Sequence, residues 1–123
     1  MTNMKGIGGV KETTNDDPSK IGTGAIKYDA GKPAVWQGAI AYFPKALEAV
    51  ANVSAFGASK YQWAGWRSVE DGPNRYSNAM LRHLLSYAKG EDVAEDSNLT
   101  HLAHAAWNAL AILELSIVQQ EAS

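Results

Sequence analysis

The segment from Thr100 to Gln120, THLAHAAWNALAILELSIVQQ, constrains the fold more than any other part of the chain. At helical spacing it is apolar on nearly every side, except for one polar line at positions i, i+3 and i+7: His101, His104 and Asn108. A helix of this kind is buried on most sides, so we expect the polar line inside the molecule. Buried polar groups cost about 1–3 kcal/mol each when unpaired, so they need partners. Metal ions, carboxylates and a ligand are the candidates.

Two further helices are predicted, and no segment has the pattern of a strand. The first covers residues 44–61 and begins at Pro44, a residue favoured at the first helical position. The second covers residues 75–89 and ends at Gly90. Its apolar residues are expected to bury one side: Met80, Leu81, Leu84, Leu85 and Ala88. Asn98 or Thr100 is expected to cap the third helix. The predicted fold class is all-α, a helical bundle.

With 123 residues, the chain has the size of one domain that can fold without stabilising disulfides or metals. Residues 1–25 carry almost no large apolar side chains, so they are predicted to be a flexible tail before a domain over 26–119. The absence of cysteine excludes a disulfide scaffold and a thiolate zinc site. A net charge of −2 argues against binding to nucleic acid. Without a signal peptide or an uncharged apolar run near the ~20 residues that span a bilayer, a cytoplasmic protein with no membrane partner is expected.

All three histidines of the chain fall close together in the sequence, and this is the main candidate for a chemical site. His83 lies on the second predicted helix, and an acidic loop over residues 91–96 separates it from His101 and His104. Imidazole nitrogens with carboxylate oxygens suit Mg²⁺ or Mn²⁺ when a phosphate completes the shell. A second interpretation stays open: core histidines bonded to carbonyls, and an acidic loop that complements the dipole of the next helix.

Three blocks of sequence, in the same order, resemble one known family. They are KYDAGKP, FGASKYQWAGW and LRHLLSYAKGEDVAEDSNLTHLAHAAWNALAILEL. Together, over about residues 26–115, they resemble the phage and bacterial dATP/dGTP diphosphohydrolases, MazG-like members of the all-α nucleoside triphosphate pyrophosphohydrolases. Within that family the phage MazZ type is similar, which implies cleavage of purine (d)NTP, with dGTP or GTP favoured, to supply dGMP for 2-aminoadenine DNA. The resemblance also implies a homodimer or homotetramer.

The resemblance implies hydrolysis between the α- and β-phosphates, in which metal ions neutralise the triphosphate and activate a water. In the superfamily, ExxE and ExxD helix pairs hold the metal, whereas here His83, His101 and His104 occupy such positions. The negative charge that balances the metal ions must then come from acidic residues elsewhere in the chain. The implied ligands of two or more Mg²⁺ or Mn²⁺ ions, with Co²⁺ as a further candidate, are Glu48, His83, Glu91, Asp92, His101 and His104. The implied catalytic residues are Glu48, as base or metal bridge, His83 and Asp92.

The same resemblance implies which residues contact the nucleotide. Lys27 and Asp29 belong to a motif that closes over it, other cations suit phosphate oxygens, and tryptophans suit a purine base. The nucleotide-binding candidates are Lys27, Asp29, Lys32, Trp36, Lys60, Trp63, Arg82 and Asn108, and Trp66 and Arg67 share these chemistries.

A second class of function stays open: a non-catalytic nucleotide-sensing or helical interaction module on the same scaffold. The replacement of carboxylates by imidazoles favours it. An HD-type phosphohydrolase needs a His-Asp dipeptide on a helix, and the chain has none.

Overall fold

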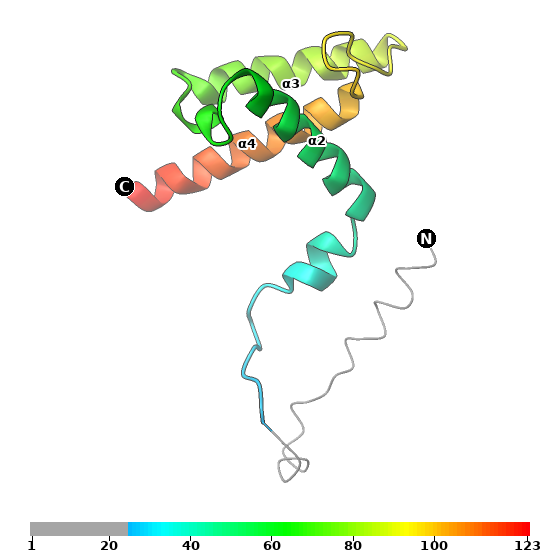
Figure 1. Ribbon diagram of the computed structural model, residues 1–123. Helices are drawn as coiled ribbons and strands as arrows, with labels where there is room; N and C mark the ends of the chain where they lie inside the picture. The colour runs from blue at the N-terminus through cyan, green and yellow to red at the C-terminus, as the bar shows by residue number, and fades with distance from the viewer. Residues whose placement is uncertain (1–24) are drawn as a thin grey trace. The chain divides into compact units, whose positions relative to one another are not determined.

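A computed structural model describes residues 25–123, which divide into two units at Pro44 and Lys45. The predicted tail over 1–25 lies outside the described residues except for its last position, so that boundary stays a prediction. The described residues are helical, and their only extended pairing is an isolated bridge between Val93 and Thr100. The all-α prediction is confirmed (Figure 1).

In the first unit, the KYDAGKP segment forms a turn in which Lys32 N donates to Asp29 O at 3.1 Å. Gly31 sits in this turn at φ +81°, a conformation that favours glycine. A single π-helical turn, η3 (Trp36–Ile40), follows, with Ala41 N donating to Trp36 O at 2.8 Å. The sequence pattern did not predict η3, because one turn is too short to show a periodic apolar face.

The second unit contains three helices and a short 3-10 turn. Helix α2 (Pro44–Lys60) matches its prediction to within one residue, and η4 (Gly65–Ser68) lies in the connector that follows. Helix α3 (Gly72–Ala88) begins three residues before its predicted start, and α4 (His101–Ala122) begins where expected. Thr100 caps α4, because its Oγ1 accepts from Ala103 N at 3.1 Å.

Helices α3 and α4 pack side by side and form the main interface of this unit (Figure 1). Gly72, at the start of α3, is buried where the two helices approach. A Cβ added at Gly72 would lie 3.3 Å from Tyr76 Cε2 and 3.6 Å from Leu115 Cδ1. The early start of α3 therefore brings its first turn against α4, a contact that only tertiary packing reveals.

The buried core is built from small side chains, and half of them lie on the first half of α4: Ala103, Ala105 and Ala111. The polar line of α4 is buried beside them, as predicted, with His101 8%, His104 7% and Asn108 5% exposed. The two other helices, α2 and α3, leave much of α4 uncovered, so the expectation of burial on most sides is wrong. Leu102 and Leu110 are exposed in its first half, and its second half is more exposed still. Leu113, Ile117 and Val118 lie exposed there.

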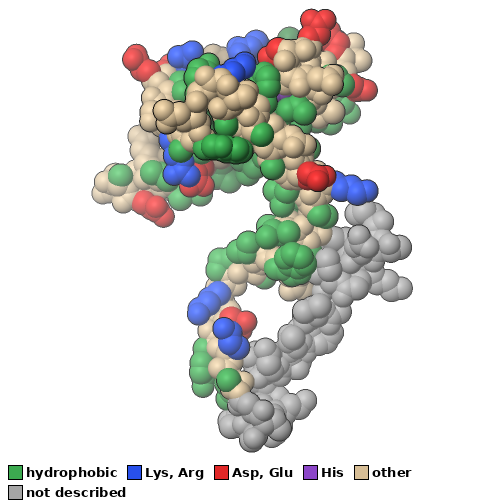
Figure 2. Space-filling model, in the orientation of Figure 1, with side chains coloured by type: hydrophobic (Ala, Val, Ile, Leu, Met, Phe, Trp, Pro, Cys, Tyr) green, Lys and Arg blue, Asp and Glu red, His purple; other side chains and the backbone are tan. Residues whose placement is uncertain are grey.

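The predicted apolar side of α3 is likewise not buried within one chain. Leu81, Leu84 and Leu85 are 57%, 39% and 60% exposed, and Ala88 is exposed as well, whereas Met80 is partly buried. The reason is that α3 faces α4 with its more polar residues, including His83. Hydrophobic side chains are therefore prominent on the surface of the helices (Figure 2).

Among the described residues, α4 is the one helix that is long and apolar enough to cross a membrane by length and composition. A core helix of a soluble protein satisfies the same criterion, and the first half of α4 serves as a core helix here. The membrane and compartment expectations stay predictions.

Candidate functional site

The three histidines converge at the interface of α3 and α4, as the sequence suggested. The His83 and His104 rings stack with centroids 4.4 Å apart and planes 7° apart. His83 Nδ1 and His101 Nδ1 share a hydrogen bond of 2.8 Å. We call these three residues the histidine cluster. It joins the two helices by ring stacking and a shared proton.

Two further ring nitrogens of the cluster lie close to protein groups. His104 Nε2 hydrogen-bonds Ser97 Oγ at 2.7 Å, and the Phe56 ring of α2 packs edge-on against His104. Glu91 Oε1 lies 4.0 Å from His101 Nε2. Protein groups therefore lie against both histidines of the polar line, as their burial requires.

Burial and mutual repulsion keep two members of the cluster neutral at neutral pH. Desolvation, together with the nearby charges of His104, His101 and Arg82, lowers the pKa of His83 from 6.5 to about 4, while Asp96 opposes the shift. Desolvation also lowers the pKa of His104, with Asp96 again opposing and His101 and Lys60 reinforcing it. A low-dielectric site disfavours the imidazolium form of each ring.

The histidine cluster does not fit a metal centre in this arrangement. Within residues 25–123, no group of three histidines or acidic residues stands close enough together to hold a metal ion. His83 and His101 direct their Nδ1 atoms at each other rather than at a common point. Glu48 and Asp92 are exposed, and Asp92 meets the cluster through its backbone, where its carbonyl accepts from His101 N at 2.8 Å. The predicted ligand set therefore stays a prediction.

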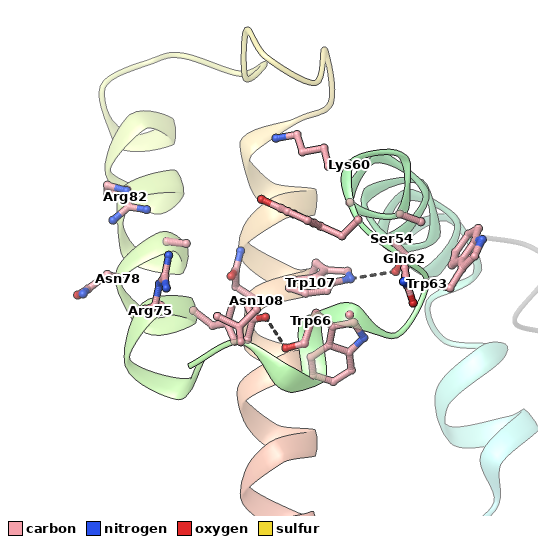
Figure 3. A pocket seen from close by; sticks show the side chains of 17 residues that line it. Ser54, Lys60, Gln62, Trp63, Trp66, Arg75, Asn78, Arg82, Trp107 and Asn108 are labelled. Atoms are coloured by element: carbon pink, nitrogen blue, oxygen red, sulfur yellow. Dashed lines mark hydrogen bonds between the residues drawn. The ribbon is translucent and has the colours of Figure 1, made fainter. Parts of the chain in front are cut away.

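A cavity of about 740 Å³ lies between α2, η4, α3 and α4, within the second unit (Figure 3). Of the predicted nucleotide-binding residues, Lys60, Trp63, Arg82 and Asn108 line it. The other four lie in the first unit: Lys27, Asp29, Lys32 and Trp36.

The wall of the cavity is cationic and aromatic. It carries Lys60, Arg75 and Arg82, and it includes no aspartate or glutamate. Trp107 forms edge contacts with Trp66 and with Tyr76, each with ring centroids 5.6 Å apart. Such a wall suits a ligand that combines negative charge with a flat ring.

Hydrogen bonds hold the aromatic part of this wall in place. Tyr76 Oη donates to Trp66 O at 2.5 Å, and Trp107 Nε1 donates to Ser54 Oγ at 2.9 Å (Figure 3). The second bond joins α4 to α2. The rings therefore meet a ligand as a preformed surface rather than as loose side chains.

The sequence reasoning missed a polar line on α3. Arg75, Asn78 and Arg82 line the cavity at positions i, i+3 and i+7, the same spacing that identified the polar line of α4. Helical periodicity contains this signal, but it is weaker than the apolar pattern of the same helix. Trp107, on the apolar helix α4, is partly buried and also lines the cavity.

The cationic end of the cavity lies beside the histidine cluster. The charge of Lys60 lowers the pKa of His104, and the charge of Arg82 lowers the pKa of His83. A ligand anion bound between these two cations would therefore lie next to the imidazoles and next to Asp96, which acts on both rings.

Comparison with known proteins adds two findings. The family model described as dATP/dGTP diphosphohydrolase, N-terminal, matches residues 22–123. A dATP/dGTP diphosphohydrolase of Salmonella phage PMBT28 is 34% identical over 90 residues, which are 73% of this chain and 29% of that relative. The chain thus spans less than a third of the relative's length. No solved structure matches the chain.

The lowered pKa values predict how stability depends on pH. Between pH 6.5 and about 4, the unfolded chain binds protons at His83 that the folded chain does not bind. The free energy of unfolding is therefore greatest above pH 6.5 and falls as the pH drops through this window. Urea denaturation at about pH 7.5 and about pH 5 measures the difference. The His83→Phe variant should show a smaller fall, and equal wild-type stability at both pH values would contradict the arrangement.

Proposed function

Because the chain belongs to the dATP/dGTP diphosphohydrolase family, through the N-terminal region that the family model describes, we propose that it hydrolyses purine deoxynucleoside triphosphates. The reaction breaks the bond between the α- and β-phosphates, with water as the nucleophile, and yields a monophosphate and pyrophosphate. The observation that carries the proposal is the cavity, which presents three cations and an aromatic surface without any carboxylate.

The cations give the triphosphate its place in the cavity. Arg75 and Arg82 stand two turns apart on α3, roughly 10 Å along the helix axis. Arginine binds phosphate oxygens through paired N–H groups, and Lys60 adds a point charge from the end of α2. We assign the phosphates to the end formed by Lys60 and Arg82, because that end adjoins the histidine cluster and Asp96.

The aromatic side chains give the base its place. Trp66, Tyr76 and Trp107 already pack against one another, whereas Trp63 is 70% exposed and its face is open. Stacking of a nucleobase on such a ring contributes about 1–3 kcal/mol. We therefore place the base against the tryptophans, with the phosphates directed along the polar line of α3.

Metal dependence rests on the resemblance of the sequence to the family. We propose two or more Mg²⁺ or Mn²⁺ ions, or Co²⁺, as the ions that this chemistry uses on the triphosphate. Their predicted ligands, with the histidine cluster among them, stay a prediction, since no three such groups converge within residues 25–123 of one chain. A role in supplying dGMP for 2-aminoadenine DNA in a phage rests on the MazZ-type resemblance, and the phage origin of the similar protein agrees with it.

A non-catalytic nucleotide-binding module is the second candidate. The observation in its favour is that no three potential metal ligands converge among the described residues. The two candidates share the cavity and differ in whether bound nucleotide is cleaved.

Product analysis tests the reaction. The full chain is incubated with dGTP, dATP or dCTP and with Mg²⁺ or Mn²⁺, and the products are separated by chromatography. We expect monophosphate and pyrophosphate from the purine substrates, slower cleavage of dCTP, and no product in EDTA. If the triphosphate stays intact with each of the metal ions, the hydrolase proposal is wrong. Nucleotide binding by calorimetry without cleavage would then support the non-catalytic nucleotide-binding module.

Substitution of Arg82 tests the phosphate end. Loss of a charge-assisted hydrogen bond predicts that Arg82→Ala weakens the binding of the triphosphate by roughly tenfold to a hundredfold. Lys89→Ala is the matched control, because Lys89 follows the same helix and does not line the cavity. Calorimetry should show unchanged affinity for the control, and circular dichroism should show unchanged helix in both variants. Unchanged affinity in Arg82→Ala would remove Arg82 from the phosphate site.

We also propose a homodimer or homotetramer. The support is the apolar surface of α3 and α4, where Leu81, Leu85 and Leu113 are 57%, 60% and 55% exposed. Light scattering should give the mass of two or four chains, and Leu85→Glu should reduce it, because a buried unpaired charge opposes association. A wild-type mass of one chain would contradict the assembly.

A further inference from the structure

Asn108 holds a fixed and incompletely paired amide at the wall of the cavity. Its side chain is 5% exposed, and its Nδ2 donates to the His104 carbonyl one turn earlier on α4, at 2.8 Å. The opposite orientation of the amide would place two carbonyl oxygens against each other. The hydrogen bond therefore determines which end of the amide is presented elsewhere.

The other end of this amide opens to the cavity. No donor among residues 25–123 reaches Asn108 Oδ1, yet no fully enclosed side-chain oxygen or nitrogen in that part of the chain lacks a partner. Oδ1 is thus an accessible acceptor on the cavity wall, of which Asn108 is a part. In Figure 3 Asn108 lies between Trp107 and the side chains of α3.

The surroundings define which donor this acceptor takes. Lys60, Arg75 and Arg82 repel a cationic group, so the donor must be a neutral N–H or O–H on an anionic ligand. The phosphates of a nucleotide are acceptors. Trp107, the preceding residue, belongs to the aromatic surface, so the part of the ligand that meets Asn108 is the base.

Resting on the proposed function, we infer that Asn108 Oδ1 accepts a hydrogen bond from the exocyclic amino group of the purine base. Adenine and guanine both carry such a group, and adenine in a nucleotide has no other N–H. Asn108 therefore acts as a specificity-determining residue. A base without an amino group leaves Oδ1 unpaired, a loss that binding cannot recover.

The test removes the amino group of the base and the side-chain amide of Asn108, first separately and then together. Affinities are measured by calorimetry in EDTA for two ligand pairs. The first pair is dATP and the triphosphate of unsubstituted purine deoxyriboside, which lacks the 6-amino group of adenine. The second pair is dGTP and dITP, which lacks the 2-amino group of guanine. In the wild-type chain, loss of the amino group should weaken binding roughly tenfold or more in at least one pair. In Asn108→Leu, the members of each pair should bind equally within about twofold, since the partner is absent.

Three controls distinguish the possible outcomes. Tripolyphosphate, which has no base, should bind the wild-type chain and Asn108→Leu equally. Asn78→Leu, the same change at another asparagine of the cavity wall, should keep the wild-type preference for the amino group. Dideoxy-ATP should bind the wild-type chain like dATP, because the contact is to the base and not to the 3′-hydroxyl.

Other results overturn the inference. The inference fails if the wild-type chain binds both members of each ligand pair with equal affinity. It also fails if Asn108→Leu keeps the wild-type preference, if tripolyphosphate loses affinity with the variant as dATP does, or if the 3′-hydroxyl accounts for the effect. Failure of the wild-type chain to bind any triphosphate, both in EDTA and with a divalent cation present, would instead remove the proposed function, and this inference with it.

Discussion

The pairing of a polar line inside an apolar helix is the constraint on which the rest of the second unit depends. His101, His104 and Asn108 are buried on α4, and burial without partners would cost more than a domain of this size can spare. Their partners come from α3, from the loop before α4 and from the backbone of α4 itself. Because hydrogen bonds and ring stacking tolerate little displacement, they fix the register of α3 against α4 more tightly than small alanine contacts would.

That register also builds the cavity. With His83 turned toward α4, the neighbouring Arg82 and the earlier Arg75 line the space between the helices and α2. The histidine cluster and the cationic wall are therefore two consequences of one helix packing. Desolvation, with smaller contributions from the charges of Lys60 and Arg82, lowers the pKa values of His104 and His83 and favours neutral imidazoles beside the site proposed for the phosphates. Neutral rings can hold or accept a proton there, whereas charged rings would break the stack.

The exposed apolar surface and the distance of two acidic residues from the histidine cluster are both properties of the single chain. A single chain leaves leucines of α3 and α4 exposed, and it leaves Glu48 and Asp92 apart from the histidine cluster. Helices α2 and α3 have too little surface to cover α4 on every side. The proposed assembly of chains would bury the leucines, whereas the residues that line the cavity all belong to one chain.

Periodicity by itself determined the helices, the polar line of α4 and the convergence of the histidines, because local spacing and burial energy act along the chain. The family resemblance named four residues of the cavity wall: Lys60, Trp63, Arg82 and Asn108. Only the tertiary structure decided that the histidines pair with one another, that α3 turns its leucines outward, and that Arg75, Tyr76 and Trp107 share a wall. These outcomes depend on how one helix is rotated against another. Spacing within a single helix carries no information about that rotation.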